Sequence, residues 1–188
     1  MPPKARITKD MVIDAAFEVA RKAGAENINA RTVSEKLNCS TQPVMYHFAT
    51  IEELKKAAYA KADQFHTGYL MDVGPHDILL GIGLNYIRFA VEEPHLFRFL
   101  FQSGLSAKNS LLEMVDSEEL IPVISAMQEA MSLDIEQTKE VFVTLALFVH
   151  GYASIILNDS LEYDEKTIAV HLERVYTGAI STIQEQTK

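Results

Sequence analysis

The sequence of 188 residues predicts an all-α protein, and three observations support this fold class. Glycine and proline are scarce, with eight and six residues, whereas chains built of β-strands use both in their many turns. Apolar residues recur at the three- and four-residue spacing of amphipathic helices, and no strand-like alternation persists. An apolar content of 48% is enough for a packed core in a chain of this length.

The first two helices have clear ends. We expect one helix from Thr8 to Ala23, with Thr8 as its N-cap and Gly24 directly after its last turn. A second, short helix fits residues 30–37, with Asn29 as its N-cap. Asn38 then falls where a left-handed backbone is needed, which asparagine tolerates better than most residues.

A third helix is expected to begin at Ser40 or Thr41 and to run through Phe48, with Pro43 in its first turn, where a missing N–H is harmless. Thr50 and Glu53 form the pattern of a capping box, which predicts a fourth helix over residues 51–71.

The remaining chain is also expected to be helical. A break at residues 74–76 separates the fourth helix from helices near residues 77–93, 94–103, 117–132, 134–158 and 164–186. The last of these has the best-defined apolar stripe, formed by Ile168, Leu172, Val175, Ala179 and Ile183.

The second and third helices are joined by only two or three residues, around Asn38 to Ser40. This is the helix-turn-helix arrangement, whose second helix lies in the major groove of DNA. The residues expected to pack inside it are Val33, Leu37, Cys39, Val44 and Phe48. The residues left facing outward are Thr41, Gln42, Tyr46 and His47. Their short or planar polar groups can reach base edges and phosphates.

The charge is unevenly distributed, although the net charge is −9. Residues 1–61 carry ten Lys and Arg against seven Asp and Glu, a net charge of +3, whereas the remainder carries seven against nineteen, a net charge of −12. A basic end on an acidic body suggests that one end alone meets a polyanion. Uneven surface charge with no partner is the alternative from charge alone.

The stretch VSEKLNCSTQPVMYHFATIEEL, between an amphipathic helix and a longer one, resembles the N-terminal domain of the TetR family. The residues in register with the family pattern are Val33, Leu37, Cys39, Ser40, Val44, Phe48 and Leu54. Three positions depart from it: Asn38 stands for a glycine, Met45 for a tyrosine that often contacts phosphate, and Ile51 for a phosphate-binding lysine. Tyr46 and Lys55 are our candidates to replace the two lost contacts.

The resemblance implies a helix-turn-helix DNA-binding domain of three helices over residues 1–62, with the motif at about 30–49. A helical ligand-binding and dimerisation domain, with a four-helix bundle between protomers, would follow over residues 63–188. The expected DNA-binding residues are Lys4, Arg6, Arg31, Ser40, Thr41, Gln42, Tyr46, His47, Thr50 and Lys55. Lys9 is a further candidate for a phosphate contact.

The body is expected to serve two purposes. Helix 134–158 is apolar nearly all round in its second half, so one face needs a partner, which predicts a homodimer. The alternative is a monomer in which this helix is deeply buried. The dimer-interface candidates are Phe148, Tyr152, Ile156, Leu172, Val175 and Ala179. By the resemblance, the middle helices enclose a pocket for a small-molecule effector. The pocket candidates are Tyr86, Phe89, Phe97, Phe101, Met127 and Met131, although plain core is the better interpretation for each residue taken singly.

Other function classes lack their signatures. The segment GIGLNY lacks the third glycine of a phosphate loop and lies within a predicted helix, and the six histidines show no metal-ligand spacing, so we expect neither an enzyme nor a cofactor. The apolar run at 141–157 is short for a membrane span, and we expect a helix buried on most of its circumference. A single cysteine and the lack of a signal peptide indicate the cytoplasm.

The sequence therefore predicts a ligand-responsive repressor that binds a palindromic or pseudo-palindromic DNA operator as a homodimer. The alternative is an all-helical protein–protein interaction module without sequence-specific DNA binding.

Overall fold

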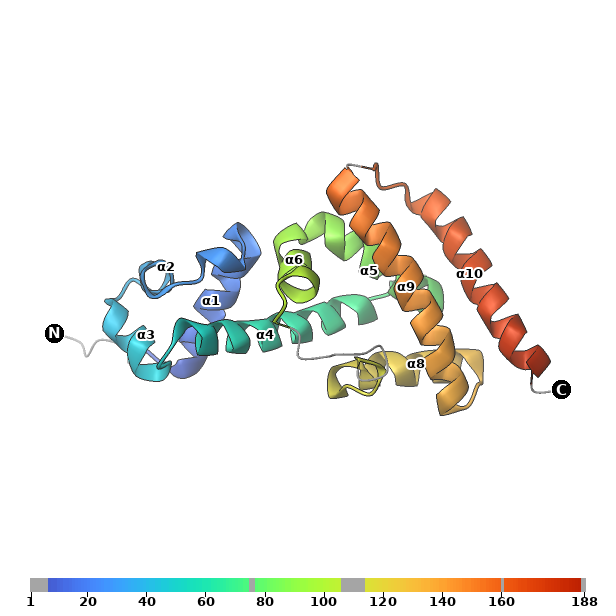
Figure 1. Ribbon diagram of the computed structural model, residues 1–188, viewed down its shortest axis with the longest axis horizontal. Helices are drawn as coiled ribbons and strands as arrows, with labels where there is room; N and C mark the ends of the chain where they lie inside the picture. The colour runs from blue at the N-terminus through green and yellow to red at the C-terminus, as the bar shows by residue number, and fades with distance from the viewer. Residues whose placement is uncertain (1–6, 75–76, 106–113, 160, 187–188) are drawn as a thin grey trace. The chain divides into compact units, whose positions relative to one another are not determined.

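The computed structural model describes residues 7–74, 77–105, 114–159 and 161–186 (Figure 1). The regular elements within these ranges are all helical, which confirms the predicted fold class. They are α1 (Lys9–Ala23), η1 (Ala25–Asn27), α2 (Ala30–Lys36), α3 (Thr41–His47), α4 (Ile51–Met71), α5 (Ile78–Glu92), α6 (Pro94–Gln102), η2 (Glu118–Leu120), α8 (Ile121–Met131), α9 (Ile135–Asp159) and α10 (Glu165–Gln186).

The predicted caps set the ends of the first helices. The Thr8 hydroxyl accepts a hydrogen bond from the Met11 N–H at 3.2 Å, and α1 ends at Gly24, whose φ of 95° is open mainly to glycine. Asn29 caps α2 through a capping box with Thr32. These local bonds satisfy backbone groups that the first turn of a helix leaves without an intrahelical partner.

The start of α4 differs slightly from the predicted capping box. The Thr50 hydroxyl accepts from the Glu53 N–H at 3.2 Å, as predicted. The Glu53 carboxylate, however, accepts from the N–H of Ala49 at 3.0 Å rather than from that of Thr50. The box therefore closes one residue earlier, at the last bend of the chain between α3 and α4.

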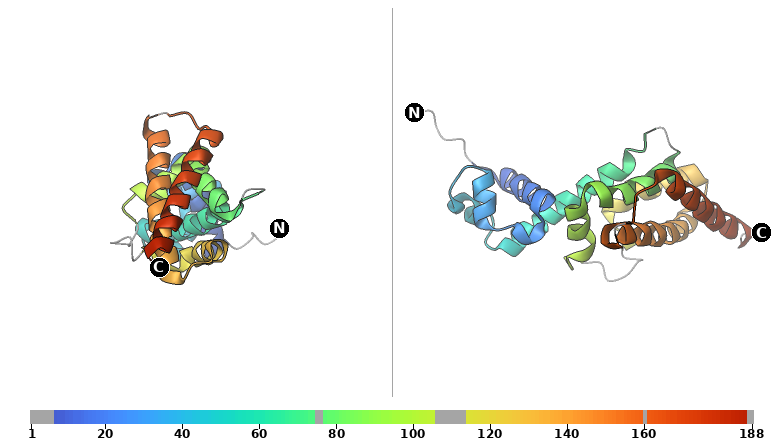
Figure 2. Two further views of the ribbon diagram at one scale, coloured as in Figure 1. Left: turned by 90° about the vertical axis from the view of Figure 1, so that its right-hand side faces the viewer. Right: turned by 90° about the horizontal axis from the view of Figure 1, so that it is seen from above.

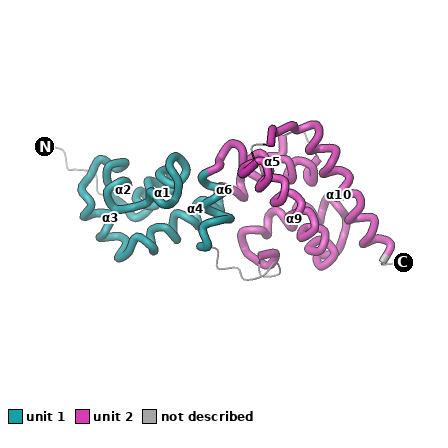
Figure 3. The backbone as a smooth tube through the Cα atoms, turned by 45° about the horizontal axis from the view of Figure 1, so that its top comes forward, with its two compact units in different colours: residues 1–64, 95–106 teal, residues 65–94, 107–188 magenta. Residues whose placement is uncertain are grey.

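The chain forms two compact units, coloured separately in Figure 3. Unit 1 comprises residues 1–64 and 95–106, and unit 2 comprises residues 65–94 and 107–188. Residues of α6 join unit 1, where the Tyr59 hydroxyl of α4 donates to the Leu100 carbonyl at 3.0 Å and its ring contacts that of Phe99. The functional boundary between residues 62 and 63 stays a prediction.

Unit 2 is built around α5, which packs against α8, α9 and α10. The helices α9 and α10 lie side by side and run in opposite directions, as Figures 1 and 2 show. One apolar cluster joins α5, α9 and α10 through Leu84, Ile87, Val149, Ile168 and Leu172, among others. A second cluster joins the end of α4 to α5, α8 and α9.

The helix α9 is more exposed than its sequence indicated. Among the described residues it is the one helix long and apolar enough to cross a membrane by length and composition, and 28% of its most apolar 18-residue window is buried. The expectation of a helix buried on most of its circumference is thus wrong within one chain. The reason is that α5, α8 and α10 cover only part of it and leave Leu147, Gly151 and Ile155 exposed.

Candidate nucleic-acid interface

The turn between α2 and α3 has the predicted backbone. Asn38 adopts a left-handed conformation with φ of 50°, and the Cys39 N–H donates to the Ser34 carbonyl at 3.0 Å. Val33, Val44 and Phe48 are buried beneath it, whereas Leu37 and Cys39 are only partly buried. The two short helices α2 and α3 are thereby held together from the inside.

The outer face of α3 presents the polar side chains that the sequence placed there. Thr41 and Gln42 in its first turn are exposed, and Tyr46 is 76% exposed. The flanking Ser40 and Thr50 are exposed as well. No hydrogen bond within the described part of the chain engages the side chains of Gln42 or Tyr46, so both are available to a ligand outside unit 1.

His47 occupies a different place from these residues. It is partly buried, and its ring Nε2 lies 2.9 Å from the carbonyl oxygen of Ile7, so the imidazole is the donor. Next to this bond, the Lys9 ammonium lies 5.2 Å from the centroid of the Phe48 ring, within the range of a cation–π contact. These two contacts join the beginning of α1 to the end of α3.

Two of the cationic side chains predicted to bind DNA are less available than expected: Arg31 is paired with a carboxylate, and Lys55 is partly buried. The Arg31 side chain is exposed, but its Nε lies 2.9 Å from the Glu35 carboxylate one helical turn away, and this bond raises the pKa of Arg31. Lys55 is partly buried on the first turns of α4. Lys4 and Arg6 lie outside the described residues.

The six pocket candidates divide between the two units. Phe97 and Phe101 belong to unit 1, where their ring centroids are 4.9 Å apart. In unit 2, Phe89 is fully buried, and Met127 and Met131 are part of the apolar cluster with the end of α4. The fourth residue of unit 2, Tyr86, is hydrogen-bonded through its hydroxyl to Nδ1 of His150 at 2.9 Å.

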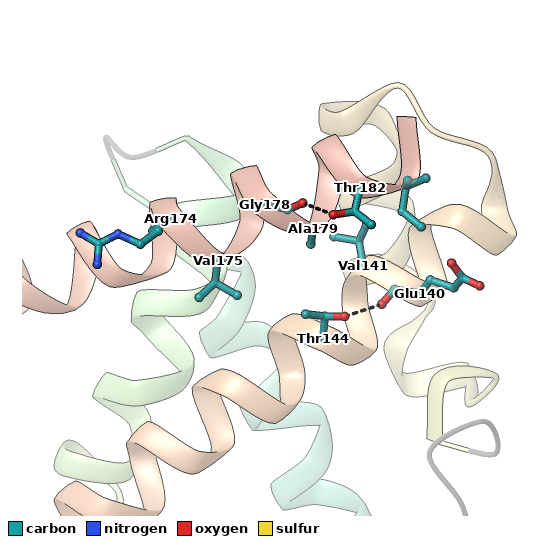
Figure 4. A pocket seen from close by; sticks show the side chains of 9 residues that line it. Glu140, Val141, Thr144, Arg174, Val175, Gly178, Ala179 and Thr182 are labelled. Atoms are coloured by element: carbon teal, nitrogen blue, oxygen red, sulfur yellow. Dashed lines mark hydrogen bonds between the residues drawn. The ribbon is translucent and has the colours of Figure 1, made fainter. Parts of the chain in front are cut away.

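A groove of about 510 Å³ lies between α9 and α10 (Figure 4). It is lined by Glu140, Val141, Thr144, Arg174, Val175, Gly178, Ala179, Thr182 and Ile183, and by none of the six pocket candidates. Its two threonines donate to carbonyls of their own helices, Thr144 to Glu140 at 3.2 Å and Thr182 to Gly178 at 2.9 Å. The threonine hydroxyl protons are therefore already donated, and the rest of the lining is charged at Glu140 and Arg174 and small or apolar elsewhere.

The dimer-interface candidates are unequally exposed. Ile156 and Leu172 are 8% and 2% exposed and belong to the core of unit 2, so they offer almost no surface to a partner. Phe148, Tyr152, Val175 and Ala179 are partly buried. Leu147, Ile155 and Val170 are 56%, 49% and 52% exposed, and none of them is among the residues predicted from the sequence.

The spacing of residues along α9 indicates in part which of its apolar side chains are exposed. Thr144, Leu147, Gly151 and Ile155 follow one another at spacings of three and four residues, which places them on one face of α9. Because the other faces of this helix are nearly as apolar, the sequence alone could not say which face would remain outside.

No group of three or more His, Cys, Asp or Glu able to hold a metal ion occurs among the described residues. A helix-turn-helix with an exposed polar face, joined to a helical body, is thus the arrangement that the chain presents.

Comparisons with known proteins agree with this arrangement. The "Uncharacterized HTH-type transcriptional regulator YobS" of Bacillus subtilis is 21% identical over 172 residues, which cover 88% of this chain and 87% of the relative. A TetR family transcription regulator from Marinobacter aquaeolei has a similar fold, with a TM-score of 0.63 at 13% identity over 90% of this chain and 93% of the other. The multidrug binding protein EbrR complexed with ethidium gives a TM-score of 0.55 at 19% identity, over 93% and 99% of the two chains.

The family itself is shown by the match of a family profile. The profile described as "Tetracyclin repressor-like, C-terminal domain" matches residues 79–177, more than half of the chain. The matched segment runs from α5 to α10 and contains the helices that form the core of unit 2. The chain therefore belongs to the TetR family of transcriptional regulators.

Proposed function

We propose that this TetR-family regulator is a cytoplasmic repressor that binds its operator as a homodimer and is released by a small-molecule effector. The observation that carries the proposal is the outer face of α3, where Thr41, Gln42 and Tyr46 are exposed on a short helix that α2 holds from behind. A helix so placed fits the major groove, and its polar groups suit base edges and phosphates.

Each exposed residue of α3 has a distinct expected role. The Gln42 amide can bond both N6 and N7 of adenine, and the Thr41 methyl group can contact that of thymine. The Tyr46 hydroxyl is our candidate for the phosphate contact that Met45 cannot make, and Lys55 replaces the cation missing at Ile51. Ser40, Thr50 and Arg31 flank this surface as further phosphate or base contacts.

Homodimerisation is supported by the uncovered face of α9. Leu147 is 56% exposed and lies on the same face as Ile155 and Gly151, beside the groove between α9 and α10. A second copy packed on this face would form a symmetric four-helix bundle with α9 and α10 of each protomer. A two-fold dimer binds two half-sites about 34–36 Å apart, which predicts a palindromic or pseudo-palindromic operator.

The effector is expected to bind in unit 2. Tyr86, Phe89, Met127 and Met131 remain its candidate lining, since aromatic and methionine side chains adapt to apolar ligands. The complex of EbrR with ethidium supports a ligand-binding role for a similar fold. Release from DNA requires that the effector bind more tightly to a conformation that no longer fits the operator, because only such a difference shifts the equilibrium.

A gel-shift experiment with the DNA upstream of the protein's own coding sequence tests the proposal. We expect sequence-selective binding whose affinity falls steeply as the salt concentration rises, because bound Lys and Arg release counterions from DNA. An interaction module whose helix-turn-helix is only structural would show no selective binding at low salt, and that result would refute the proposal.

Two substitutions separate base recognition from backbone contact. We expect Gln42→Ala to relax the base preference, with a loss of about 1–3 kcal/mol at the preferred base, because a bidentate contact is removed. Lys55→Ala should weaken all DNA sequences alike and lower the salt dependence by about one counterion. Fluorescence anisotropy with the selected duplex and its point variants measures both effects.

The controls use similar residues away from α3. Gln64→Ala and Lys56→Ala remove an exposed glutamine and an exposed lysine of α4. We expect Gln64→Ala to leave base preference unchanged and Lys56→Ala to leave the affinity and its salt dependence unchanged. Equal and negligible effects of Gln42→Ala and Gln64→Ala would contradict the assignment of α3 as the recognition helix.

A further inference from the structure

Asn85 of α5 is a polar side chain in the interior of unit 2. It is 4% exposed, and its amide nitrogen lies 3.1 Å from the Tyr69 carbonyl oxygen, 3.3 Å from that of Leu70 and 2.8 Å from that of Asp72. The Tyr69 and Leu70 carbonyls belong to the last turn of α4, which stops at Met71, and Asp72 follows it directly. A helix leaves its last carbonyls without intrahelical donors. The Asn85 amide thus caps α4 from the neighbouring helix.

The side-chain oxygen of Asn85 makes a further hydrogen bond, to Arg88. This oxygen accepts from Nη1 of Arg88 at 3.3 Å, and Nη2 of Arg88 lies 2.7 Å from the Glu165 carboxylate. Glu165 is the first residue of α10, and the Tyr163 hydroxyl donates to the same carboxylate oxygen at 3.3 Å. One line of polar contacts therefore joins the end of α4 to α5 and to the beginning of α10.

Capping this helix with a buried amide is unfavourable in free energy unless all the amide's hydrogen bonds are made. Asp72 and Gly74 directly after α4 are exposed, so water could serve the last carbonyls of α4. Burying an amide is tolerated only when its bonds are made, and removing one partner leaves the others unsatisfied. In return, the amide fixes α4 to α5 in one geometry, which a bond to water would not do.

The helix that Asn85 holds has residues in both units. Residues 51–64 of α4 belong to unit 1, with the helix-turn-helix, and residues 65–71 belong to unit 2. We propose that Asn85 is a positioning residue for DNA binding, which fixes the last turn of α4 to α5 and, through Arg88 and Glu165, to α10. This inference rests on the proposed function, since it concerns how a dimer holds its two recognition helices.

The test measures the distance between spin labels on the two protomers by pulsed electron–electron double resonance. A spin label is placed at position 22 on α1 with Lys22→Cys in a Cys39→Ser background, so that each protomer carries one label. In this parent we expect a narrow distribution of distances between the labels. Asn85→Leu, which keeps the volume but removes the amide, should broaden it.

The same variants are titrated with the selected duplex. If Asn85→Leu leaves about a tenth of the protein in the binding conformation, the apparent affinity falls about tenfold, while base preference and salt dependence stay unchanged. Arg88→Gln breaks the link to Glu165 but keeps the Asn85 donors, so it should have a smaller effect of the same kind and remains informative if Asn85→Leu does not fold. Val149→Ala, a buried truncation on α9, controls for loss of stability alone.

The outcomes separate the two proposals. If Asn85→Leu and Arg88→Gln fold and keep the parent's distance distribution and affinity, or if Val149→Ala changes them equally, the inference about Asn85 is overturned while the dimeric regulator stands. If the parent shows no distance between protomers, the proposed dimer fails and this inference fails with it.

Discussion

His66 lies on the inner side of α4, 5% exposed, with its ring edge-on to the rings of Tyr86 and Phe89 at centroid distances of 5.4 and 4.7 Å. Burial disfavours the charged imidazolium and lowers the pKa of His66 from 6.5 to about 3. Burial also lowers the pKa of His150, which is bonded to Tyr86. Burial therefore keeps both His66 and His150 in the neutral form near neutral pH.

This burial predicts an acid-sensitive stability. Below pH 6.5 the unfolded chain binds a proton at His66 that the folded chain does not bind until about pH 3, so the free energy of unfolding falls as the pH drops through this range. We expect a loss of about 2 kcal/mol between pH 7 and pH 5 from this residue. Urea unfolding of the parent and of His66→Phe at both pH values measures it.

The variant His66→Phe keeps an aromatic ring but removes the titrating group. Its free energy of unfolding should change less between pH 7 and pH 5 than that of the parent, with a remaining slope to which His150 contributes. Identical slopes in the two proteins would contradict a neutral, buried His66.

Single side chains were the least predictable part of the molecule. The outward positions of Thr41, Gln42 and Tyr46 follow from the period of a helix, and the structure confirms their exposure. The bond from His47 to the Ile7 carbonyl and the ion pair of Arg31 with Glu35 could not be read in this way. Both depend on where a neighbouring group lies in space, although a spacing of four residues does permit the second.

Among the elements, α5 shows why two glycines can stand inside a helix. A Cβ added to Gly81 would lie 2.5 Å from Cβ of Val73, and one added to Gly83 would lie 2.9 Å from a methyl carbon of Leu172 on α10. The segment that was rejected as a phosphate loop therefore serves close packing, with the chain after α4 against Gly81 and α10 against Gly83. Helix ends and lengths were predicted within a few residues because capping and periodicity are local.

A pair of substitutions tests this packing. Gly81→Ala should lower the free energy of unfolding by about 1–3 kcal/mol, because the new methyl group overlaps Val73 close to its backbone. Gly68→Ala, in the last turn of α4, meets nothing within 4 Å and should raise it by about 0.5–1 kcal/mol. Thermal and urea unfolding followed by circular dichroism compare the two. An equal effect of both would mean that α5 does not need the close approach at Gly81.

At the scale of the whole molecule, the basic and acidic residues are concentrated in different parts of the chain. The basic residues collect in the stretch that forms α1 to α3 and the first turns of α4, and the acidic excess lies in the remainder. This division was visible in the sequence, because charge counts need no coordinates. The face of α9 that remains uncovered was not, because it depends on how three other helices pack around it.

The uncovered face predicts the effect of a charge placed on it. Leu147→Glu should convert the proposed dimer to a monomer, because the carboxylate would have to be buried between protomers without a partner. Ile121→Glu, at the equally exposed first residue of α8, should leave the dimer intact. Sedimentation velocity gives the two masses, and circular dichroism checks that both variants are folded. A dimer that persists in Leu147→Glu would place the interface elsewhere.

The exposed face of α9 also bears on how the protein is made. On the ribosome α9 emerges before α10, and its contacts with α10 cannot form until some 30 further residues have been added. In the proposed dimer, its uncovered face waits longer still for a second finished chain. If the proposed dimer forms, a nascent helix with the hydropathy of a membrane span is thus exposed twice, first before α10 is made and then before a second chain binds. Synthesis of the two chains close together, as from one messenger, would shorten the second exposure.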